Sequence, residues 1–185
     1  MLRPLEMAHQ FLAEVITKED VVVDATMGNG HDTAFLAQLA GQVYAFDIQE
    51  QALANTQEKL DKLGLQHVQL ILDGHQHVDQ YVETIKAAIF NLGYLPSADK
   101  SVITLPATTI EAMEKICVRL EKGGRMAIMI YYGHEGGDIE RDAVLDFVSQ
   151  LPQKDYTATI YRTLNQVNQP PFLVMIEKLE SYRHG

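Results

Sequence analysis

The chain has 185 residues, which is long enough to bury one hydrophobic core. Its composition, 46% hydrophobic and 22% charged residues, is ordinary for a globular protein. A formal net charge of −10 argues against a surface coated in cations for sequence-blind nucleic-acid binding, although a local basic cluster could still hold a structured RNA. No apolar run reaches the roughly 20 residues that span a bilayer, no secretory signal core is found, and the single Cys117 excludes an internal disulfide. We therefore expect one cytoplasmic domain over residues 1–185, without a membrane partner and with Cys117 as a buried thiol.

Helices and strands are predicted to alternate along most of the chain. Apolar spacing predicts a helix from Pro4, and short apolar runs predict five buried strands, each followed by a helix. The strands are expected at 21–26, 42–48, 67–73, 86–92 and 125–132. The helices between and after them are expected at 32–40, 50–63, 77–85, 108–120 and 139–150. A capping box from Thr108 to Glu111 is expected to open the fourth of these, and Gly123 and Gly124 to end it.

The last part of the chain breaks this alternation. Residues 156–164 and 171–179 predict two strands, and the connection between them is too short for a crossover helix, so they must pair antiparallel. Five βα repeats followed by a hairpin predict an α/β fold, with a mostly parallel, seven-stranded, doubly wound sheet. This layout is typical of the Rossmann-like methyltransferase fold more than of a dehydrogenase domain, which lacks the terminal hairpin.

The segment after the first strand has the chemistry of a ligand-binding loop. Ligands of doubly wound sheets bind beyond the carboxyl ends of the strands, and Gly28 and Gly30 let the backbone there take positive φ and approach a ligand. Thr33 stands where a dinucleotide site has its third glycine, and Asp32 would repel a diphosphate. A cationic sulfonium with an amino-acid tail meets neither obstacle. A structural turn without a ligand is the alternative.

Acidic residues end the first two strands. Asp24 can orient the loop or meet an ammonium group of the ligand. Asp47 can accept both hydroxyls of a ribose, which the glycine loop favours, or cap the helix that follows. Gln49 can reach the sugar or the edge of an adenine.

The third strand ends in Asp73, Gly74 and His75, where an adenine would lie. Asp73 can meet the adenine amino group or simply build a turn with Gly74. His75 can stack on the ring or bond to it.

The fourth strand ends in Phe-Asn-Leu-Gly-Tyr-Leu-Pro, residues 90–96, where amine-methylating enzymes of this fold carry a D/N-P-P-Y-like tetrapeptide. An amine attacks only when neutral, yet its pKa of about 10 keeps it charged at pH 7. The side-chain carbonyl of Asn91 can hold the N–H groups, desolvation lowers the amine pKa, and Tyr94 can form an aromatic wall or stack on a base. We predict that Asn91 and Tyr94 are catalytic. A Gly-Pro loop over the core is the alternative.

Two further loops supply candidate substrate-binding residues. Tyr131, Tyr132 and His134 follow the fifth strand and are expected to face the same crevice, where His134 could take a proton, bind phosphate, or bond to the backbone. Asn165 and Asn168 can read a base edge or cap the hairpin turn.

Six motifs in order, DATMGNGHDT, FDIQ, DGHQ, FNLGYLP, YYGHEGG and NQVNQPPFL, resemble the MnmM (YtqB-like) family of tRNA wobble-uridine methyltransferases, formerly labelled rRNA methylases. The resemblance covers essentially the whole chain. It implies S-adenosyl-L-methionine (SAM) as cofactor and conversion of 5-aminomethyl-2-thiouridine to 5-methylaminomethyl-2-thiouridine at the tRNA wobble position. It also implies the tRNA anticodon region as partner, with a homodimer as an option. Cofactor contacts are expected at Asp24, Thr26, Gly28, Asn29, Gly30, Asp32, Asp47, Gln49, Asp73, Gly74 and His75.

The predicted chemistry is in-line methyl transfer, with catalysis mostly from positioning. No metal is predicted, because His75 and His77 lack a matching set of carboxylates. The alternatives are a methyltransferase for rRNA or for a small-molecule amine, a SAM-binding module without activity, and a nucleotide-dependent oxidoreductase.

Overall fold

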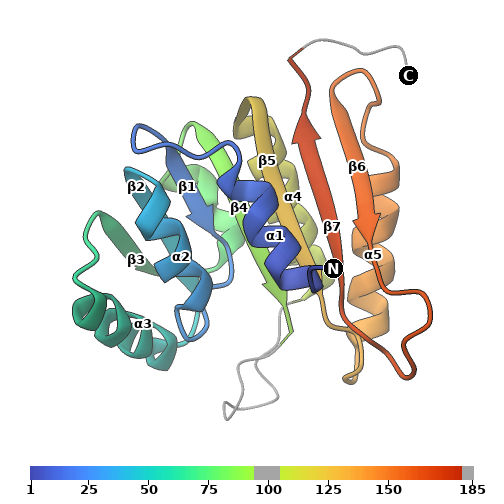
Figure 1. The fold of residues 1–185 in the computed structure, drawn as a ribbon, viewed down its shortest axis with the longest axis horizontal. Coiled ribbons are helices and arrows are strands. Elements are labelled where there is room, and N and C mark those ends of the chain that lie inside the picture. Colours follow the sequence, from blue (N-terminus) through green and yellow to red (C-terminus); the bar gives the residue numbers. More distant parts are fainter. Residues whose placement is uncertain (94–104, 181–185) are drawn as a thin grey trace.

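The computed structural model describes residues 1–93 and 105–180, in which seven strands form one sheet of order β3-β2-β1-β4-β5-β7-β6 (Figure 1). The strands are β1 (Val21–Asp24), β2 (Gln42–Asp47), β3 (Val68–Leu72), β4 (Ile85–Leu92), β5 (Leu120–Ile130), β6 (Tyr156–Tyr161) and β7 (Phe172–Lys178). The first five run parallel, and β7 pairs antiparallel with both β5 and β6. The predicted doubly wound sheet with a terminal hairpin is confirmed.

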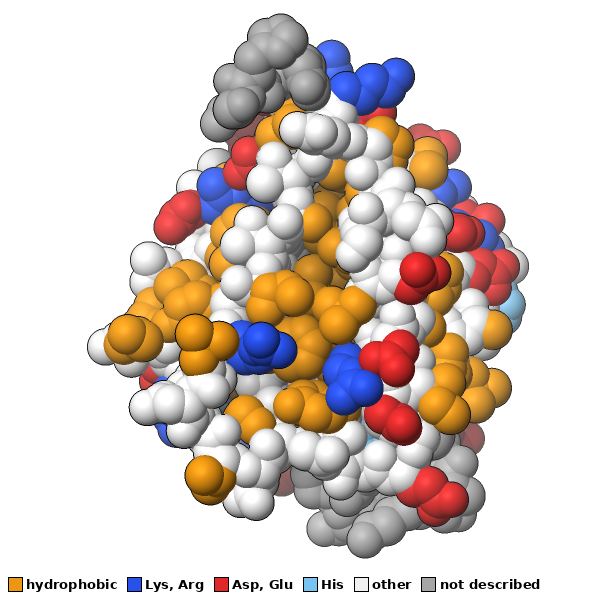
Figure 2. Space-filling view, turned by 90° about the vertical axis from the view of Figure 1, so that its right-hand side faces the viewer, with side chains coloured by type: hydrophobic (Ala, Val, Ile, Leu, Met, Phe, Trp, Pro, Cys, Tyr) orange, Lys and Arg blue, Asp and Glu red, His pale blue; other side chains and the backbone are white. Residues whose placement is uncertain are grey.

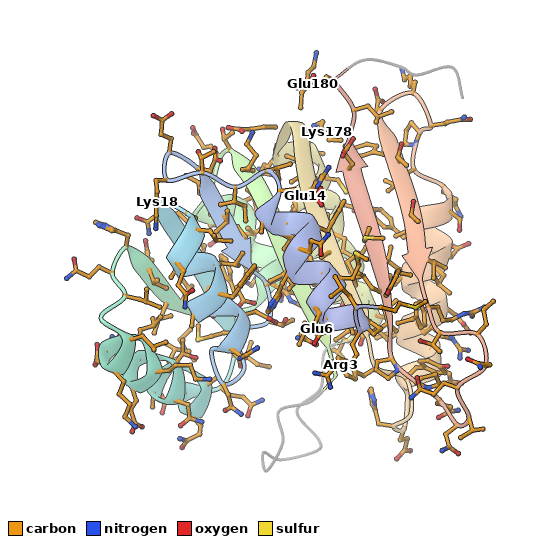
Figure 3. All side chains as sticks on the ribbon, viewed as in Figure 1. Arg3, Glu6, Glu14, Lys18, Lys178 and Glu180 are labelled. Carbon is orange, nitrogen blue, oxygen red and sulfur yellow. The ribbon has the colours of Figure 1, made fainter. Side chains whose placement is uncertain are left out.

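Helices cover both faces of this sheet. They are α1 (Pro4–Ala13), α2 (His31–Leu39), α3 (Glu50–Leu63), the 3-10 helix η1 (His75–Gln80), α4 (Pro106–Arg119) and α5 (Gly137–Ser149). In Figure 1, α1, α2 and α3 lie in front of the sheet, and α4 and α5 lie behind it. The start of α1 agrees with the prediction: Pro4 is its first residue, and the Glu6 carboxylate accepts the backbone N–H of Arg3 at 2.8 Å, near the lower end of α1 in Figure 3.

The alternation of side chains along β4 explains why its sequence is apolar throughout. Ala87 and Ile89 belong to the core cluster under α1, α2 and α3, whereas Ala88, Phe90 and Leu92 belong to the cluster under α4 and α5. Successive strand residues point to opposite faces, so a strand covered on both sides needs apolar residues at every position. Such a buried central strand gives its carboxyl end a fixed position.

Cys117 lies in the core cluster on the α4 side, where burial raises the pKa of its thiol to about 12. The expectation of a buried thiol is confirmed. No helix within residues 1–93 and 105–180 combines the length and the apolar character needed to cross a bilayer.

Some predicted boundaries are wrong, most clearly those around η1 and α4. The helix expected at 77–85 is the shorter η1, because Val78 within it and Val82 just after it are both buried and Ile85 already pairs with β5. The helix expected from Thr108 begins at Pro106, and the Thr108 hydroxyl donates to the carbonyl of Leu105 at 3.0 Å instead of capping.

Gly123 and Gly124 lie inside β5 rather than ending the helix before it. A Cβ on Gly124 would lie 2.8 Å from the backbone oxygens of Lys86 and Glu121, so this glycine permits close approach of backbone beside the irregularity between β4 and β5. The double glycine is therefore a sheet feature and not a helix stop.

The sheet edge formed by β6 is open to solvent. Figure 2 shows this side of the molecule, where hydrophobic side chains gather among scattered charges. Ile160, Leu164 and Val167, on β6 and just after it, are 49%, 87% and 76% exposed. The homodimer stays a prediction.

Candidate active site

The glycine loop between β1 and α2 has the predicted backbone. Gly28 and Gly30 have φ of 54° and 83°, in the left-handed region that suits glycine. The Gly28 N–H donates to Asp47 Oδ2 at 3.1 Å, and its carbonyl accepts the Thr56 hydroxyl at 3.3 Å. A Cβ on Gly30 would lie 2.7–2.9 Å from the Thr56 side chain. Contacts from β2 and α3 therefore fix the shape of this loop.

Sequence reasoning missed Thr56. It is fully buried on the same face of α3 as Ala52 and Leu60, four residues on either side. A polar residue in the apolar stripe of an amphipathic helix is a signal that its hydroxyl has a buried partner. The pattern that predicted the helix therefore contained the information needed to find Thr56.

Asp24 supports the loop from inside the protein. Its fully buried carboxylate accepts the Thr33 hydroxyl at 2.6 Å and the backbone N–H of Thr26 at 3.1 Å. Both oxygens are engaged by the loop and the first turn of α2, which favours the loop-orienting interpretation of Asp24 over an ammonium contact. Thr33, which stands where a dinucleotide site has its third glycine, thus has a structural partner.

Burial, with a further contribution from Asp32, raises the pKa of Asp24 to about 7. A carboxyl whose pKa is raised on folding adds stability below its unfolded pKa of about 3.9 and loses that contribution as the pH rises through the folded value. Asp24→Asn keeps the size of the side chain and removes the titration, because the amide oxygen can still accept the Thr26 N–H while the NH₂ group donates to the Thr33 hydroxyl. Because only the wild type loses this contribution as the pH rises, we expect the melting temperature of the variant minus that of the wild type to be higher at about pH 8 than at about pH 5. Thermal unfolding at the two pH values measures this, and an unchanged difference would contradict it.

Asp47 and Gln49 lie beside the glycine loop, at the carboxyl end of β2. The second oxygen of Asp47 accepts the backbone N–H of Gln49 at 2.9 Å, and Gln49 is the residue before α3. Asp47 thus builds the turn into α3 without being its cap residue, and its half-buried carboxylate remains at the loop. Ribose binding by Asp47 stays a prediction.

The carboxylate of Asp73 is hydrogen-bonded within the segment that follows β3. Its carboxylate accepts from the Gly74 backbone at 2.8 Å and the Tyr81 hydroxyl at 3.0 Å, and it lies 2.7 Å from His77 Nδ1. Hydrogen bonds from His77 and Tyr81 lower the pKa of this carboxyl. These contacts favour the turn-building interpretation of Asp73 over an adenine contact.

His75 lies under the loop, between the ends of β1 and β4. Its Nδ1 is 3.0 Å from the carbonyl of Ala25, and its ring packs at 5.4 Å on Phe90. A carbonyl only accepts, so Nδ1 carries the proton and Nε2 has the lone pair. Burial lowers the pKa of His75, so this ring is neutral at pH 7 and suited to accept a hydrogen bond.

Asp32 lies between α1 and the end of β4. It is buried, its Oδ1 lies 2.7 Å from His9 Nε2, and its Oδ2 accepts the side-chain N–H of Asn91 at 2.8 Å. Both carboxylate oxygens therefore face protein groups, because the first turn of α2 points this side chain inward toward α1 and β4. The cofactor contact expected at Asp32 stays a prediction. Asn29, by contrast, is exposed on the loop and accepts from Asn55 at 3.0 Å.

Asn91 stands at the end of β4, beside the glycine loop. Its backbone N–H donates to the Thr26 hydroxyl at 2.6 Å, and its side chain donates to Asp32. Tyr94, the other predicted catalytic residue, lies outside the described residues.

The predicted substrate residues after β5 separate into two sides of the chain. The Tyr131 backbone donates to the carbonyl of Leu92 at 3.2 Å, and burial together with Asp32 raises the pKa of its phenol, so Tyr131 lies beside the end of β4, and its role in binding substrate stays a prediction. The ring of Tyr132 instead packs at 5.8 Å on Phe172 and lies 4.9 Å below the Arg141 guanidinium. Neighbours in an extended segment point to opposite sides, so the expectation that both tyrosines face one crevice is wrong.

The loop after β5 and the β6–β7 loop are neighbours. A Cβ on Gly133 would lie 3.4 Å from Gln169 Oε1. Asn165 and Asn168 are exposed in the second loop, and Asn168 has φ of 67°, which favours a turn-building role for that residue. His134, in the first loop, is partly buried and has a partner.

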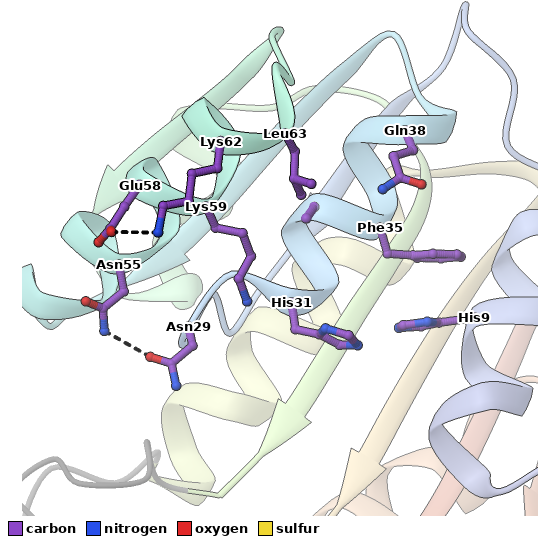
Figure 4. Close-up of a pocket in the computed structure, with 11 residues that line it drawn as sticks. His9, Asn29, His31, Phe35, Gln38, Asn55, Glu58, Lys59, Lys62 and Leu63 are labelled. Carbon is purple, nitrogen blue, oxygen red and sulfur yellow. Dashed lines mark hydrogen bonds and ion pairs between the residues drawn. The ribbon is translucent and has the colours of Figure 1, made fainter.

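A groove of about 740 Å³ lies between α2 and α3, next to the glycine loop (Figure 4). Its lining residues are His9, Asn29, His31, Ala34, Phe35, Gln38, Asn55, Glu58, Lys59, Lys62 and Leu63. Lys62 pairs with Glu58 at 3.0 Å, and the His9 ring stacks on Phe35 at 3.9 Å. Two lysines against one glutamate leave the lining of this groove with a small excess of positive charge on an acidic chain, and we call it the cationic groove. Within the described ranges, no group of three or more His, Cys, Asp or Glu residues could hold a metal ion.

Comparison with known proteins identifies the family. The family model described as "Putative rRNA methylase" matches residues 43–177. A curated Arabidopsis thaliana protein, named a chloroplastic tRNA (mnm(5)s(2)U34)-methyltransferase, is 35% identical over 188 residues, covering 94% of this chain and 69% of that protein. The chain belongs to this methyltransferase family.

Solved methyltransferase structures match nearly the whole chain. A Streptococcus mutans protein, whose crystal structure is of a complex with SAH, is 62% identical with a TM-score of 0.93, covering 97% of this chain and 99% of that one. An rRNA methylase from Streptococcus thermophilus is 56% identical with a TM-score of 0.86 and the same coverage. The family resemblance expected from six sequence motifs is confirmed.

Proposed function

We propose that this SAM-dependent methyltransferase methylates the amine of 5-aminomethyl-2-thiouridine at the wobble position of tRNA, as one catalytic domain over residues 1–185. The observation that carries the proposal is the anchored amide of Asn91 at the end of β4, beside the glycine loop. The named activity of the Arabidopsis relative supports tRNA and the wobble uridine as substrate.

The residues around the loop fit SAM. Left-handed glycines leave room for close approach, and the half-buried carboxylate of Asp47 and the neutral imidazole of His75 offer acceptors for ribose and adenine. The carboxylates of Asp32 and Asp47 give the region negative charge, which suits a sulfonium and an ammonium and opposes a diphosphate. The SAH complex of the Streptococcus mutans relative supports the same cofactor. An oxidoreductase dependent on a dinucleotide is correspondingly disfavoured.

When bound, SAM supplies an electrophilic methyl group on a sulfonium. The chain's own residues position the acceptor: the Asn91 carbonyl accepts an N–H of the amine, and the ring of Tyr131, which is 37% exposed, offers an aromatic surface beside it. Removing the amine from water lowers its pKa, so more of it is neutral and its lone pair is available. Catalysis then follows mostly from orientation and desolvation.

The cationic groove supports an RNA over a small-molecule amine as the substrate. Each lysine that contacts a phosphate releases counterions, which makes binding depend on salt. We expect Lys59→Glu with Lys62→Glu to weaken tRNA binding and to reduce the slope of log affinity against log salt by about 1 to 2. Filter binding over a salt series measures the slope. Lys122→Glu, at the opposite end of the parallel strands, is the matched control, and an equal loss there would contradict a role of the groove.

The substrate itself is tested by mass spectrometry of nucleosides. Purified enzyme, isotope-labelled SAM and tRNA carrying 5-aminomethyl-2-thiouridine are expected to give labelled 5-methylaminomethyl-2-thiouridine. Ribosomal RNA and a small alkylamine, incubated in parallel, test the two alternatives. Label in rRNA or in the alkylamine, with none in the wobble nucleoside, would overturn the proposed substrate.

A further inference from the structure

We propose that Asp32 and His9 are positioning residues that hold the Asn91 amide with its carbonyl oxygen toward the methyl acceptor. The assignment deepens the proposed function and rests on it, because it gives Asn91 the role of accepting an N–H from the substrate amine. It takes Asp32 out of the expected cofactor contacts and adds His9, which no sequence motif indicated.

The orientation of the Asn91 amide follows from its partner. A carboxylate has only acceptor oxygens, so the group 2.8 Å from Asp32 Oδ2 must be the Asn91 NH₂. The Asn91 oxygen therefore points away from Asp32. The Thr26 hydroxyl, 2.6 Å from the Asn91 backbone nitrogen, fixes the other end of the residue. Two hydrogen bonds, one to the backbone and one to the side chain, thus define where the carbonyl lies.

Asp32 is itself held from α1. His9 Nε2 lies 2.7 Å from Asp32 Oδ1, and the His9 ring stacks face to face on Phe35, with centroids 3.9 Å apart and planes 6° apart. Figure 4 shows His9 beside Phe35, with His31 nearby. The stack fixes the plane of the imidazole and so the direction of its bond to Asp32. A relay of contacts thus runs from α1 through α2 to the end of β4.

A buried carboxylate in this position costs free energy unless it is bonded. The side chain of Asp32 is 6% exposed, and Asp24 lies close enough for Asp32 to raise the Asp24 pKa. Burial, with a further contribution from Asp32, raises the pKa of the Tyr131 phenol. A pair of bonds, from His9 and from Asn91, therefore stabilises a charge that neighbouring acids disfavour. This buried carboxylate has a function if it prevents the Asn91 amide from turning over. With its NH₂ group toward the N–H of the substrate amine, Asn91 could not accept a hydrogen bond, and the reaction would be blocked.

The first test separates positioning from cofactor binding. We expect Asp32→Ala to lower kcat about 100-fold while the dissociation constant for SAM, from calorimetry, changes less than about threefold. Asp32→Asn keeps an acceptor for Asn91 and is expected to recover at least about tenfold of the loss. The kcat of His9→Ala is expected to lie between those of Asp32→Ala and Asp32→Asn, and His9→Gln is expected to recover part of the loss in kcat that His9→Ala causes. A rise in the SAM dissociation constant that accounts for the lost activity would overturn the assignment.

A double-mutant cycle tests whether Asp32 acts through Asn91. If it does, Asp32→Ala in an Asn91→Ala background causes no further loss of kcat. Losses that multiply would mean that Asp32 acts independently, and the assignment would fail.

The side-chain amide signal of Asn91 in a ¹H–¹⁵N spectrum gives a readout that needs no RNA. The signal is identified by its absence in Asn91→Ala. Asp32→Ala is expected to move it toward the chemical shifts of an amide without a hydrogen bond, whereas in Asp32→Asn it is expected to stay at the shifts of a hydrogen-bonded amide. An unmoved signal in Asp32→Ala contradicts the contact, whatever the substrate is. A wild-type enzyme that fails to label the wobble nucleoside contradicts the proposed substrate and leaves this spectrum unaffected, so the two failures can be told apart.

Discussion

Replacing Gly30 by alanine is expected to lower the free energy of unfolding by about 2 to 5 kcal/mol and to weaken SAM binding strongly. A left-handed backbone costs an alanine about 1 to 2 kcal/mol. The added Cβ would also lie within 2.9 Å of three atoms of the buried Thr56, and overpacking of this kind costs about 1 to 3 kcal/mol more. Thr56 cannot move without losing its bond to the Gly28 carbonyl, so the loop has to shift. Urea denaturation and calorimetry with SAM measure the two effects.

Gly64 provides a matched control for this prediction. It also has a left-handed φ, of 65°, after the last residue of α3, but a Cβ there would meet nothing within 4 Å. Gly64→Ala should therefore cost only the backbone contribution, about 1 to 2 kcal/mol, and leave SAM affinity unchanged. Equal destabilisation by the two substitutions would show that the contact with Thr56 has no energetic weight.

Asn91→Ala is expected to lower kcat about 100-fold with little change in SAM affinity. The substitution removes the oxygen that accepts the amine N–H and leaves the glycine loop, Asp47 and His75 in place. It also leaves Asp32 without one of its two partners, which costs about 1 to 3 kcal/mol of stability. Single-turnover rates with saturating SAM, together with thermal unfolding, distinguish loss of chemistry from loss of fold.

The opposite result would also be informative. An Asn91→Ala protein that binds SAM normally and keeps its turnover would remove Asn91 from the catalytic residues. The methyl acceptor would then have to be positioned elsewhere along the edge formed by β4 and β5.

The parts predicted correctly depend on local patterns. The buried strand β4 is predicted by its run of apolar residues, and the left-handed backbone of the loop is predicted by its glycines. The order of the strands along the chain restricts the sheet topology to few choices. The expected helix at 77–85 failed because two apolar positions at helical spacing fit a 3-10 turn before a strand equally well. Local patterns do not distinguish these two outcomes.

The role of Asp32 could not be predicted from its neighbours in the chain. Its partners are His9 and Asn91, separated from it by 23 and 59 residues. Whether a carboxylate beside a glycine loop points to the ligand or into the protein depends on which helix covers that end of the sheet. Here α1 lies beside α2, and its position follows only from the assembled fold.

The hydrogen bond between the Thr26 hydroxyl and the Asn91 backbone joins two halves of the site that are 65 residues apart in the chain. One half lies in the loop assigned to the methyl donor, and the other lies at the strand end assigned to the acceptor. Alignment between the two reactants therefore depends on a contact within the protein itself, and a change in the conformation of the loop also moves the residue that positions the nucleophile. Substitutions in the loop should consequently misalign the reactants as well as loosen the donor, even when the donor is supplied at saturating concentration.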